Sequence, residues 1–117
     1  MKIIEKPWGK EEMLEMNEHY MVKKLTMLKG HRCSLQYHSK KRETIYVLSG
    51  SLKILSGTNQ ESLSAKVFTA HESLTLVPGV VHRMEAEEDS VYLEASTPET
   101  EDVIRLKDDY SRVKNGL

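Results

Sequence analysis

Apolar and polar residues alternate along most of this chain with a period close to two, in short segments separated by Gly, Pro, Ser, Asn or clusters of charge. Because successive side chains of a β-strand point to opposite faces, this pattern predicts strands with one buried face rather than amphipathic helices. The predicted strands are Glu12–Met16, Met21–Leu28, Cys33–His38, Glu43–Leu48, Ser51–Leu55, Ala65–Phe68, Ser73–Val77, His82–Glu85 and Ser90–Ala95.

The connections between the predicted strands are short and regular, which is typical of a jelly roll. Ser49-Gly50 and residues 56–60 have the composition of hairpin turns, and Pro78-Gly79 that of a tight turn leading His82 into the interior. Only the tail, from about Leu106 to Val113, has a helical pattern. The sequence therefore predicts an all-β fold with a short C-terminal helix.

Length and composition narrow the class of protein. A chain of 117 residues predicts one domain, residues 1–117, with a modest core. A net charge of −1 offers no electrostatic reason to expect nucleic acid or an anionic membrane as a partner. The N-terminus has no apolar stretch long enough for a signal peptide or a membrane span, so the expected location is the cytoplasm.

Four residues carry the donor atoms of a predicted divalent-metal site. Gln36 and His38 are two positions apart, so on a strand both point to the same face. Glu43 begins the next predicted strand and His82 a third, so all four side chains can converge inside a barrel. Two imidazoles, a carboxylate and an amide oxygen suit a transition ion, but the sequence does not distinguish Zn, Mn, Fe, Co and Ni.

The spacing around this site resembles the cupin signature. Gly30, His38, Glu43 and Gly50 fall in the register of the first cupin motif, and residues 78–82 are similar to the Pro/Gly turn and His of the second. The resemblance implies a cupin barrel, which is a jelly roll or double-stranded β-helix, around one divalent metal ion.

A narrower resemblance covers nearly the whole chain. Ser34-Leu35-Gln36-Tyr37-His38 is similar to the core of the cupin domain in type II phosphomannose isomerases and mannose-1-phosphate guanylyltransferases. Residues 6–11 resemble the opening motif of that family, and residues 101–105 and 109–112 its closing motif. The family implies aldose-ketose isomerisation of a sugar phosphate such as mannose 6-phosphate, in carbohydrate metabolism, with Gln36 as a metal ligand.

The resemblance also suggests residues for chemistry and substrate binding. Glu94, or a nearby Lys, is expected to be the base that takes the proton from carbon 2 of the sugar. Lys41 stands where the family usually has Arg, and we expect it at the rim in contact with a phosphate; a Lys supplies charge but not a bidentate fork. Arg105 in the closing motif is a second expected substrate contact. Arg83 should point to the outer surface.

Other functions stay open at this point. A site with two His, one carboxylate and open positions could bind Fe(II) and activate dioxygen. The domain could instead bind a sugar or nucleotide-sugar without turnover, or catalyse another sugar-modifying step such as epimerisation. Edge strands need covering, so a homodimer is expected, with the N-terminal segment and residues 103–106 as covering strands.

Overall fold

The structure is a computed structural model that describes residues 2–110, and in this range it contains eleven strands and no helix. The strands are β1 Lys2–Lys6, β2 Gly9–Met16, β3 Met21–Met27, β4 Leu35–Tyr37, β5 Glu43–Ser49, β6 Leu52–Gly57, β7 Ser64–Phe68, β8 Ser73–Leu76, β9 Val81–Ala86, β10 Ser90–Ser96 and β11 Ile104–Lys107. Residues 2–110 thus hold no helix with the length and apolar character needed to span a membrane.

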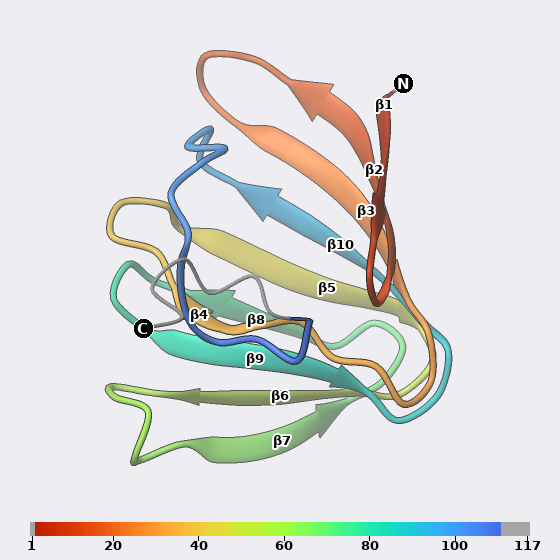
Figure 1. Ribbon diagram of the computed structural model, residues 1–117. Helices are drawn as coiled ribbons and strands as arrows, with labels where there is room; N and C mark the ends of the chain where they lie inside the picture. The colour runs from red at the N-terminus through yellow and green to blue at the C-terminus, as the bar shows by residue number, and fades with distance from the viewer. Residues whose placement is uncertain (1, 111–117) are drawn as a thin grey trace.

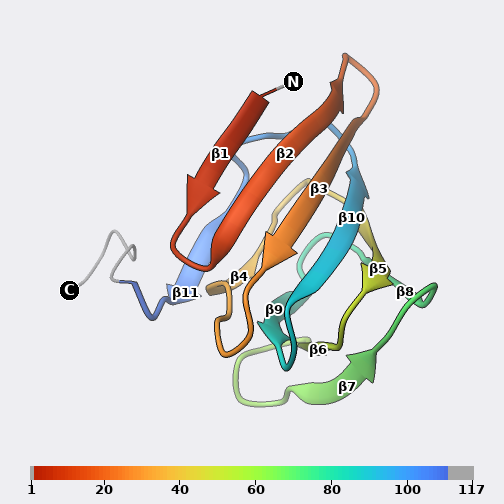
Figure 2. The same ribbon diagram turned by 90° about the vertical axis from the view of Figure 1, so that its right-hand side faces the viewer.

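The strands form two antiparallel sheets that face each other (Figure 1). One sheet has six strands in the order β1-β2-β3-β10-β5-β8, and the other has five in the order β11-β4-β9-β6-β7. Figure 2 shows β1, β2, β3 and β10 side by side. Side chains on the two inner faces fill the space between the sheets, which is the architecture of a jelly roll.

The alternation in the sequence becomes an alternation in burial. Every second residue of β3 from Met21 to Met27 is buried, and the residues between them are half-buried. β5 repeats the pattern from Glu43 to Val47. Burying one large aliphatic side chain contributes about 1.5–3 kcal/mol to the stability of the fold. The orientation of each strand that turns its apolar side chains inward is therefore strongly favoured. Two of the buried positions hold the charged residues Lys23 and Glu43 instead of apolar ones. Both of these side chains line the cavity described below.

Every predicted strand is present, and β1 and β11 lie in the two segments that were expected only as covering strands of a dimer. Residues of β1 are mostly exposed, so that strand carries little apolar alternation. It forms because its backbone pairs with β2 at the edge of the sheet, and β11 forms in the same way along β4. The segments expected to cover an edge in a dimer therefore both pair within their own chain, and the homodimer stays a prediction.

The prediction of a C-terminal helix is wrong for residues 106–110, the part of that segment that the structure describes. Leu106 and Lys107 belong to β11, Asp108 has no regular structure and residues 109–110 form a turn, while residues 111–113 lie outside the described range. A segment of this length is marginal as an isolated helix. Pairing with β4 supplies its backbone hydrogen bonds instead, so tertiary context overrides the local preference.

Candidate metal centre

His38, Glu43 and His82 come together between the two sheets. His38 follows β4, Glu43 begins β5 and His82 is the second residue of β9. One potential ligand atom from each residue lies within 4.8 Å of the others. His38 Nε2 is 3.5 Å from one Glu43 carboxylate oxygen, and His82 Nε2 is 3.4 Å from the other. All three residues are buried, with exposed fractions of 3% or less.

Backbone carbonyls fix the orientation of both imidazole rings. His38 Nδ1 donates to the carbonyl of Asp102, and His82 Nδ1 donates to the carbonyl of Val80 over 3.0 Å. A carbonyl only accepts hydrogen bonds, so in the neutral rings Nδ1 carries the proton and Nε2 presents a lone pair. Hydrogen bonds of this kind orient the histidines of metal sites and raise their basicity.

The electrostatic surroundings favour a neutral His38 and an ionised Glu43. Burial lowers the pKa of His38, although the charge of Glu43 opposes this. Burial acts to raise the pKa of Glu43, but His82 and Lys41 outweigh it and lower this pKa to about 2. Within residues 2–110, His38 Nε2 and His82 Nε2 are buried with no hydrogen-bond partner, and both face the Glu43 carboxylate, whose Oε2 also lies 3.1 Å from the Lys41 ammonium. Since buried polar atoms are almost always paired, two unpaired imidazole nitrogens beside a carboxylate fit a bound cation.

Asp102 is a site residue that sequence reasoning missed. Besides its carbonyl contact with His38, its carboxylate accepts hydrogen bonds from the backbone N–H groups of Ser39, Lys40 and Lys41 and from the Ser39 hydroxyl, at 2.6–3.1 Å. These hydrogen bonds hold its pKa below the ordinary value although burial acts to raise it. The sequence placed Asp102 in the matched closing motif. No local pattern in the sequence, however, predicts that this motif contacts the turn after His38.

Lys41 lies inside the barrel and not at the rim, contrary to the expectation from the sequence. Its ammonium is 3.1 Å from Glu43 Oε2 and 3.0 Å from Glu94 Oε2. Burial would lower its pKa, but the charges of Glu94 and Glu43 raise it above the ordinary value, so Lys41 stays protonated. The role of this Lys as a phosphate contact stays a prediction, and it is a poor choice for the base.

Glu94, the predicted base, is the second carboxylate beside Lys41. It is buried in β10, and burial together with the charge of Glu43 raises its pKa, while Lys41 acts in the opposite direction. A carboxylate whose pKa is shifted toward neutrality is better suited to exchanging protons near neutral pH.

Strand pairing places Gln36 and Arg105 beside the cluster. Gln36 in β4 is directly opposite His82 on one side and Arg105 on the other. The Ser34 hydroxyl donates to Gln36 Oε1 over 2.5 Å, which leaves one lone pair of that oxygen for a ligand bond. Arg105 lines the same cavity, and its Nε is buried with no hydrogen-bond partner among the described residues. Ligation by Gln36 and substrate contact by Arg105 stay predictions.

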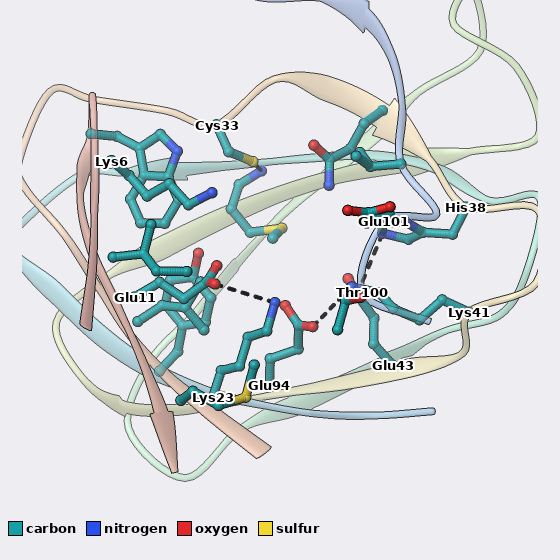
Figure 3. A pocket seen from close by; sticks show the side chains of 18 of the residues that line it. Lys6, Glu11, Lys23, Cys33, His38, Lys41, Glu43, Glu94, Thr100 and Glu101 are labelled. Atoms are coloured by element: carbon teal, nitrogen blue, oxygen red, sulfur yellow. Dashed lines mark hydrogen bonds and ion pairs between the residues drawn. The ribbon is translucent and has the colours of Figure 1, made fainter. Parts of the chain in front are cut away.

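A cavity of about 400 Å³ opens beside the cluster. Residues of the six-stranded sheet line it, including Lys2, Ile4 and Lys6 of β1, and the other side is formed by residues such as Gln36, Met84, Thr100, Glu101, Val103 and Arg105. Figure 3 shows His38, Lys41 and Glu43 gathered at one end and Glu11 with Lys23 at the other. The cavity therefore joins the candidate metal centre to a second polar region.

Glu11 and Lys23 are pocket residues that sequence reasoning did not single out. They form a buried ion pair, with Lys23 Nζ 3.3 Å from Glu11 Oε2. The signal was present, because Lys23 takes a buried position between the apolar residues Met21 and Leu25 in the period-two pattern. A charged residue in the apolar phase of a strand indicates either a pairing partner or a ligand.

Trp8 and Cys33 lie in the hydrophobic core, whereas the position of Arg83 contradicts the expectation from the sequence. Burial raises the pKa of the Cys33 thiol to about 11, so it is not a reactive thiolate. Arg83, expected on the surface, is instead buried, where its Nε donates to the Cys33 carbonyl and its Nη2 lies 3.6 Å from Asp109. The C-terminal segment covers it.

Comparisons with known proteins show the family of this chain. Residues 2–108 match the family described as mannose-6-phosphate isomerase C-terminal. Mannose-1-phosphate guanylyltransferase 2 of Escherichia coli O157:H7 is 34% identical over 80 residues, which are 68% of this chain and 16% of that protein. Mannose-1-phosphate guanylyltransferase ManC of Salmonella typhimurium is 30% identical over 113 residues, which are 92% of this chain and 22% of that protein. The chain therefore spans less than a quarter of the length of these two curated relatives.

A solved structure supports the fold. An RmlC-like cupin from Shewanella frigidimarina superposes with a TM-score of 0.74 at 25% identity, over 86% of each chain. The all-β cupin barrel that the two motifs indicated is therefore confirmed.

Proposed function

This chain belongs to the family of mannose-6-phosphate isomerase C-terminal domains, and on that premise we propose that it is a metal-dependent isomerase that interconverts an aldose phosphate and a ketose phosphate. The observation that carries the proposal is the convergence of His38 Nε2, His82 Nε2 and the Glu43 carboxylate at one end of a cavity that also contains the buried pair Lys41 and Glu94.

The metal would be held by three or four side chains. His38 and His82 would bind it through Nε2, Glu43 through a carboxylate oxygen, and Gln36 through its amide oxygen. When bound, a divalent cation would supply a Lewis acid that stabilises negative charge on the oxygens of an open-chain sugar. The donor set is compatible with Zn, Mn, Fe, Co or Ni, which compete by availability as much as by affinity.

We assign the proton transfer between carbons to Glu94. As a carboxylate it would take the proton from carbon 2 and return it to carbon 1, while a proton moves from the hydroxyl on carbon 2 to the oxygen on carbon 1. An aldose thereby becomes a ketose with no change in atoms or net charge. The ammonium of Lys41, 3.0 Å from Glu94 Oε2, would hold that carboxylate in place and favour its charged form.

The test is interconversion of mannose 6-phosphate and fructose 6-phosphate by protein reconstituted separately with Mn, Zn, Co, Ni and Fe(II). We expect turnover with at least one ion, loss of stoichiometric metal and of turnover in His38→Ala and His82→Ala, and neither loss in His19→Ala. His19 is a matched control because it is exposed and lies beside Glu18, away from the cluster. Full metal binding by both site variants would refute the metal assignment.

A second candidate function is binding of a sugar phosphate or nucleotide-linked sugar without turnover. It is favoured by the finding that the chain matches less than a quarter of the length of relatives named as guanylyltransferases and not as isomerases. Calorimetric titration of the metal-loaded protein with these ligands separates the two functions. Saturable binding with no turnover for any ion would support the binding role.

A further inference from the structure

The end of the cavity far from the candidate metal centre is positively charged. In the six-stranded sheet, β1, β2 and β3 lie at the end of the strand order away from β5, which carries Glu43. The charged residues of these three strands that line the cavity are Lys2, Lys6, Lys23 and Glu11. Three lysines against one carboxylate give this end a formal charge of +2. Figure 3 shows Lys6 on the same side of the cavity as Glu11.

Strand pairing puts the lysines of β1 on the face of the sheet that carries the proposed base. Lys2 is directly opposite Met13, Met13 is opposite Lys23, and Lys23 is opposite Glu94. Residues directly opposite each other in antiparallel strands have their side chains on the same face. Lys6 lies four residues after Lys2 on β1, so it shares that face. At about 4.8 Å per strand, the three strand spacings between β1 and β10 separate their backbones by about 14 Å.

The buried lysines of the cavity are already bound to carboxylates. Lys41 lies between two of them, at 3.0 and 3.1 Å, and Lys23 is 3.3 Å from Glu11. Lys2, by contrast, is exposed, and its ammonium makes no hydrogen bond or ion pair within residues 2–110. Lys6 is half-buried beside the same cavity. An ammonium is a compact charge with three rotatable donors on a flexible stem, which suits a phosphate.

We propose that Lys2 and Lys6 form the subsite for the phosphate group of the substrate, with Lys23 adding positive charge beside them. This inference rests on the proposed function and assigns a place to one end of its substrate. Mannose 6-phosphate and fructose 6-phosphate carry the phosphate on carbon 6, four carbons beyond carbon 2, where Glu94 would act. The carbon chain and the long side chains at both ends together bridge the distance between β10 and β1.

Charge supports the same direction for the sugar. A phosphate monoester carries a charge of about −1.5 to −2 near neutral pH, which matches the formal charge of +2 at the β1 end. At the other end, Lys41 is held by Glu43 and Glu94, so its charge is already balanced without a substrate. The subsite would therefore select phosphorylated sugars over neutral ones while the metal centre holds the reacting oxygens.

The test compares binding of two unreactive probes, D-mannitol 1-phosphate and D-mannitol, to the metal-loaded protein. Both are open chains without a carbonyl group, and they differ only in the phosphate. Calorimetry reports the affinities, and the emission of Trp8, the only tryptophan of the chain, reports occupancy of the cavity that it lines. We expect Lys2→Gln and Lys6→Gln each to weaken mannitol 1-phosphate about fivefold. The double variant should bind both probes about equally well, with unchanged affinity for mannitol and for the metal.

Two further variants serve as controls. Lys24 follows Lys23 on β3 and points to the opposite face of the sheet, so Lys24→Gln should leave both affinities unchanged. Arg105 lines the cavity opposite Gln36, outside β1. If Arg105→Gln abolishes the preference for the phosphorylated probe and the double lysine variant keeps it, the subsite is overturned. Because Lys2 is exposed and Lys6 half-buried, their variants should retain the melting temperature of the wild type.

The outcomes separate the subsite from the proposed reaction. Loss of the preference for mannitol 1-phosphate in the double lysine variant would uphold the subsite, even if no metal ion supports turnover. A retained preference, or an unchanged KM for mannose 6-phosphate, would overturn the subsite even if the protein is an isomerase. A wild type that binds the two probes equally, or binds neither, would overturn it as well.

Discussion

His38 is oriented by Asp102, a residue 64 positions further along the chain, whose backbone carbonyl accepts the hydrogen bond from Nδ1. The carboxylate of the same Asp102 binds the backbone of the turn that follows His38. One residue of the closing segment thus sets both the ring of a proposed metal ligand and the turn that carries Lys41. The closing segment is therefore part of the site as well as part of the fold.

Asp102→Ala should weaken metal binding. The carbonyl remains in the variant, but the carboxylate that anchors it to the turn is lost, so the His38 ring is less well oriented. Loss of such supporting hydrogen bonds typically costs about 10–100-fold in metal affinity. Competition with a chelator measures this. Asp89→Ala is the control, because Asp89 also accepts a backbone hydrogen bond, from Lys29 in a distant loop, and should leave metal affinity unchanged.

The stabilising effect of Asp102 should depend on pH. Its pKa in the folded protein lies below the ordinary value of 3.8, so the folded state favours the carboxylate. The contribution is then fully present above about pH 4 and falls as the pH drops from 3.8 toward the lower folded pKa. The difference in melting temperature between the wild type and Asp102→Ala should be larger at pH 7 than at pH 3. An equal difference at both values would contradict the assigned interaction.

Lys41→Met should reduce the stability of the metal-free protein by about 3–5 kcal/mol, because it leaves the carboxylates of Glu43 and Glu94 buried without the cation between them. The additional change Glu94→Gln should restore part of this loss. Urea unfolding gives the free energies. Lys40→Met, at the exposed neighbouring position, should change stability by less than about 0.5 kcal/mol. A loss of that small size in Lys41→Met would show that the ion pairs contribute little.

Two glycines of the matched motif should differ in their tolerance of alanine. Gly30 and Gly50 both have positive φ, at 84° and 93°. A Cβ at Gly30 would meet no atom within 4 Å, whereas a Cβ at Gly50 would lie 2.4 Å from the carbonyl oxygen of Asp89. Gly30→Ala should therefore cost only the backbone strain, about 1–2 kcal/mol, and Gly50→Ala distinctly more. Unfolding free energies in urea that rank the two variants in the opposite order would contradict this account.

The local pattern of the sequence determined the strands that form the core. Alternation from Met21 to Met27 and from Glu43 to Val47 has a direct physical meaning, because a slip of one residue would expose the whole apolar set. The spacing of His38 and Glu43 and the turn before His82 likewise identified the residues that meet in the cluster. These features depend on neighbours in the sequence or on a matched motif.

Only the tertiary structure decided what lies around those residues. β1 and β11 form because the edge of a neighbouring strand offers backbone partners, and no periodicity within Lys2–Lys6 or Ile104–Lys107 predicts that pairing. The burial of Lys41 follows from two carboxylates on other strands, and the orientation of His38 follows from Asp102. Such pairings join residues tens of positions apart, so their energies depend on a geometry that exists only once the two sheets have closed on each other.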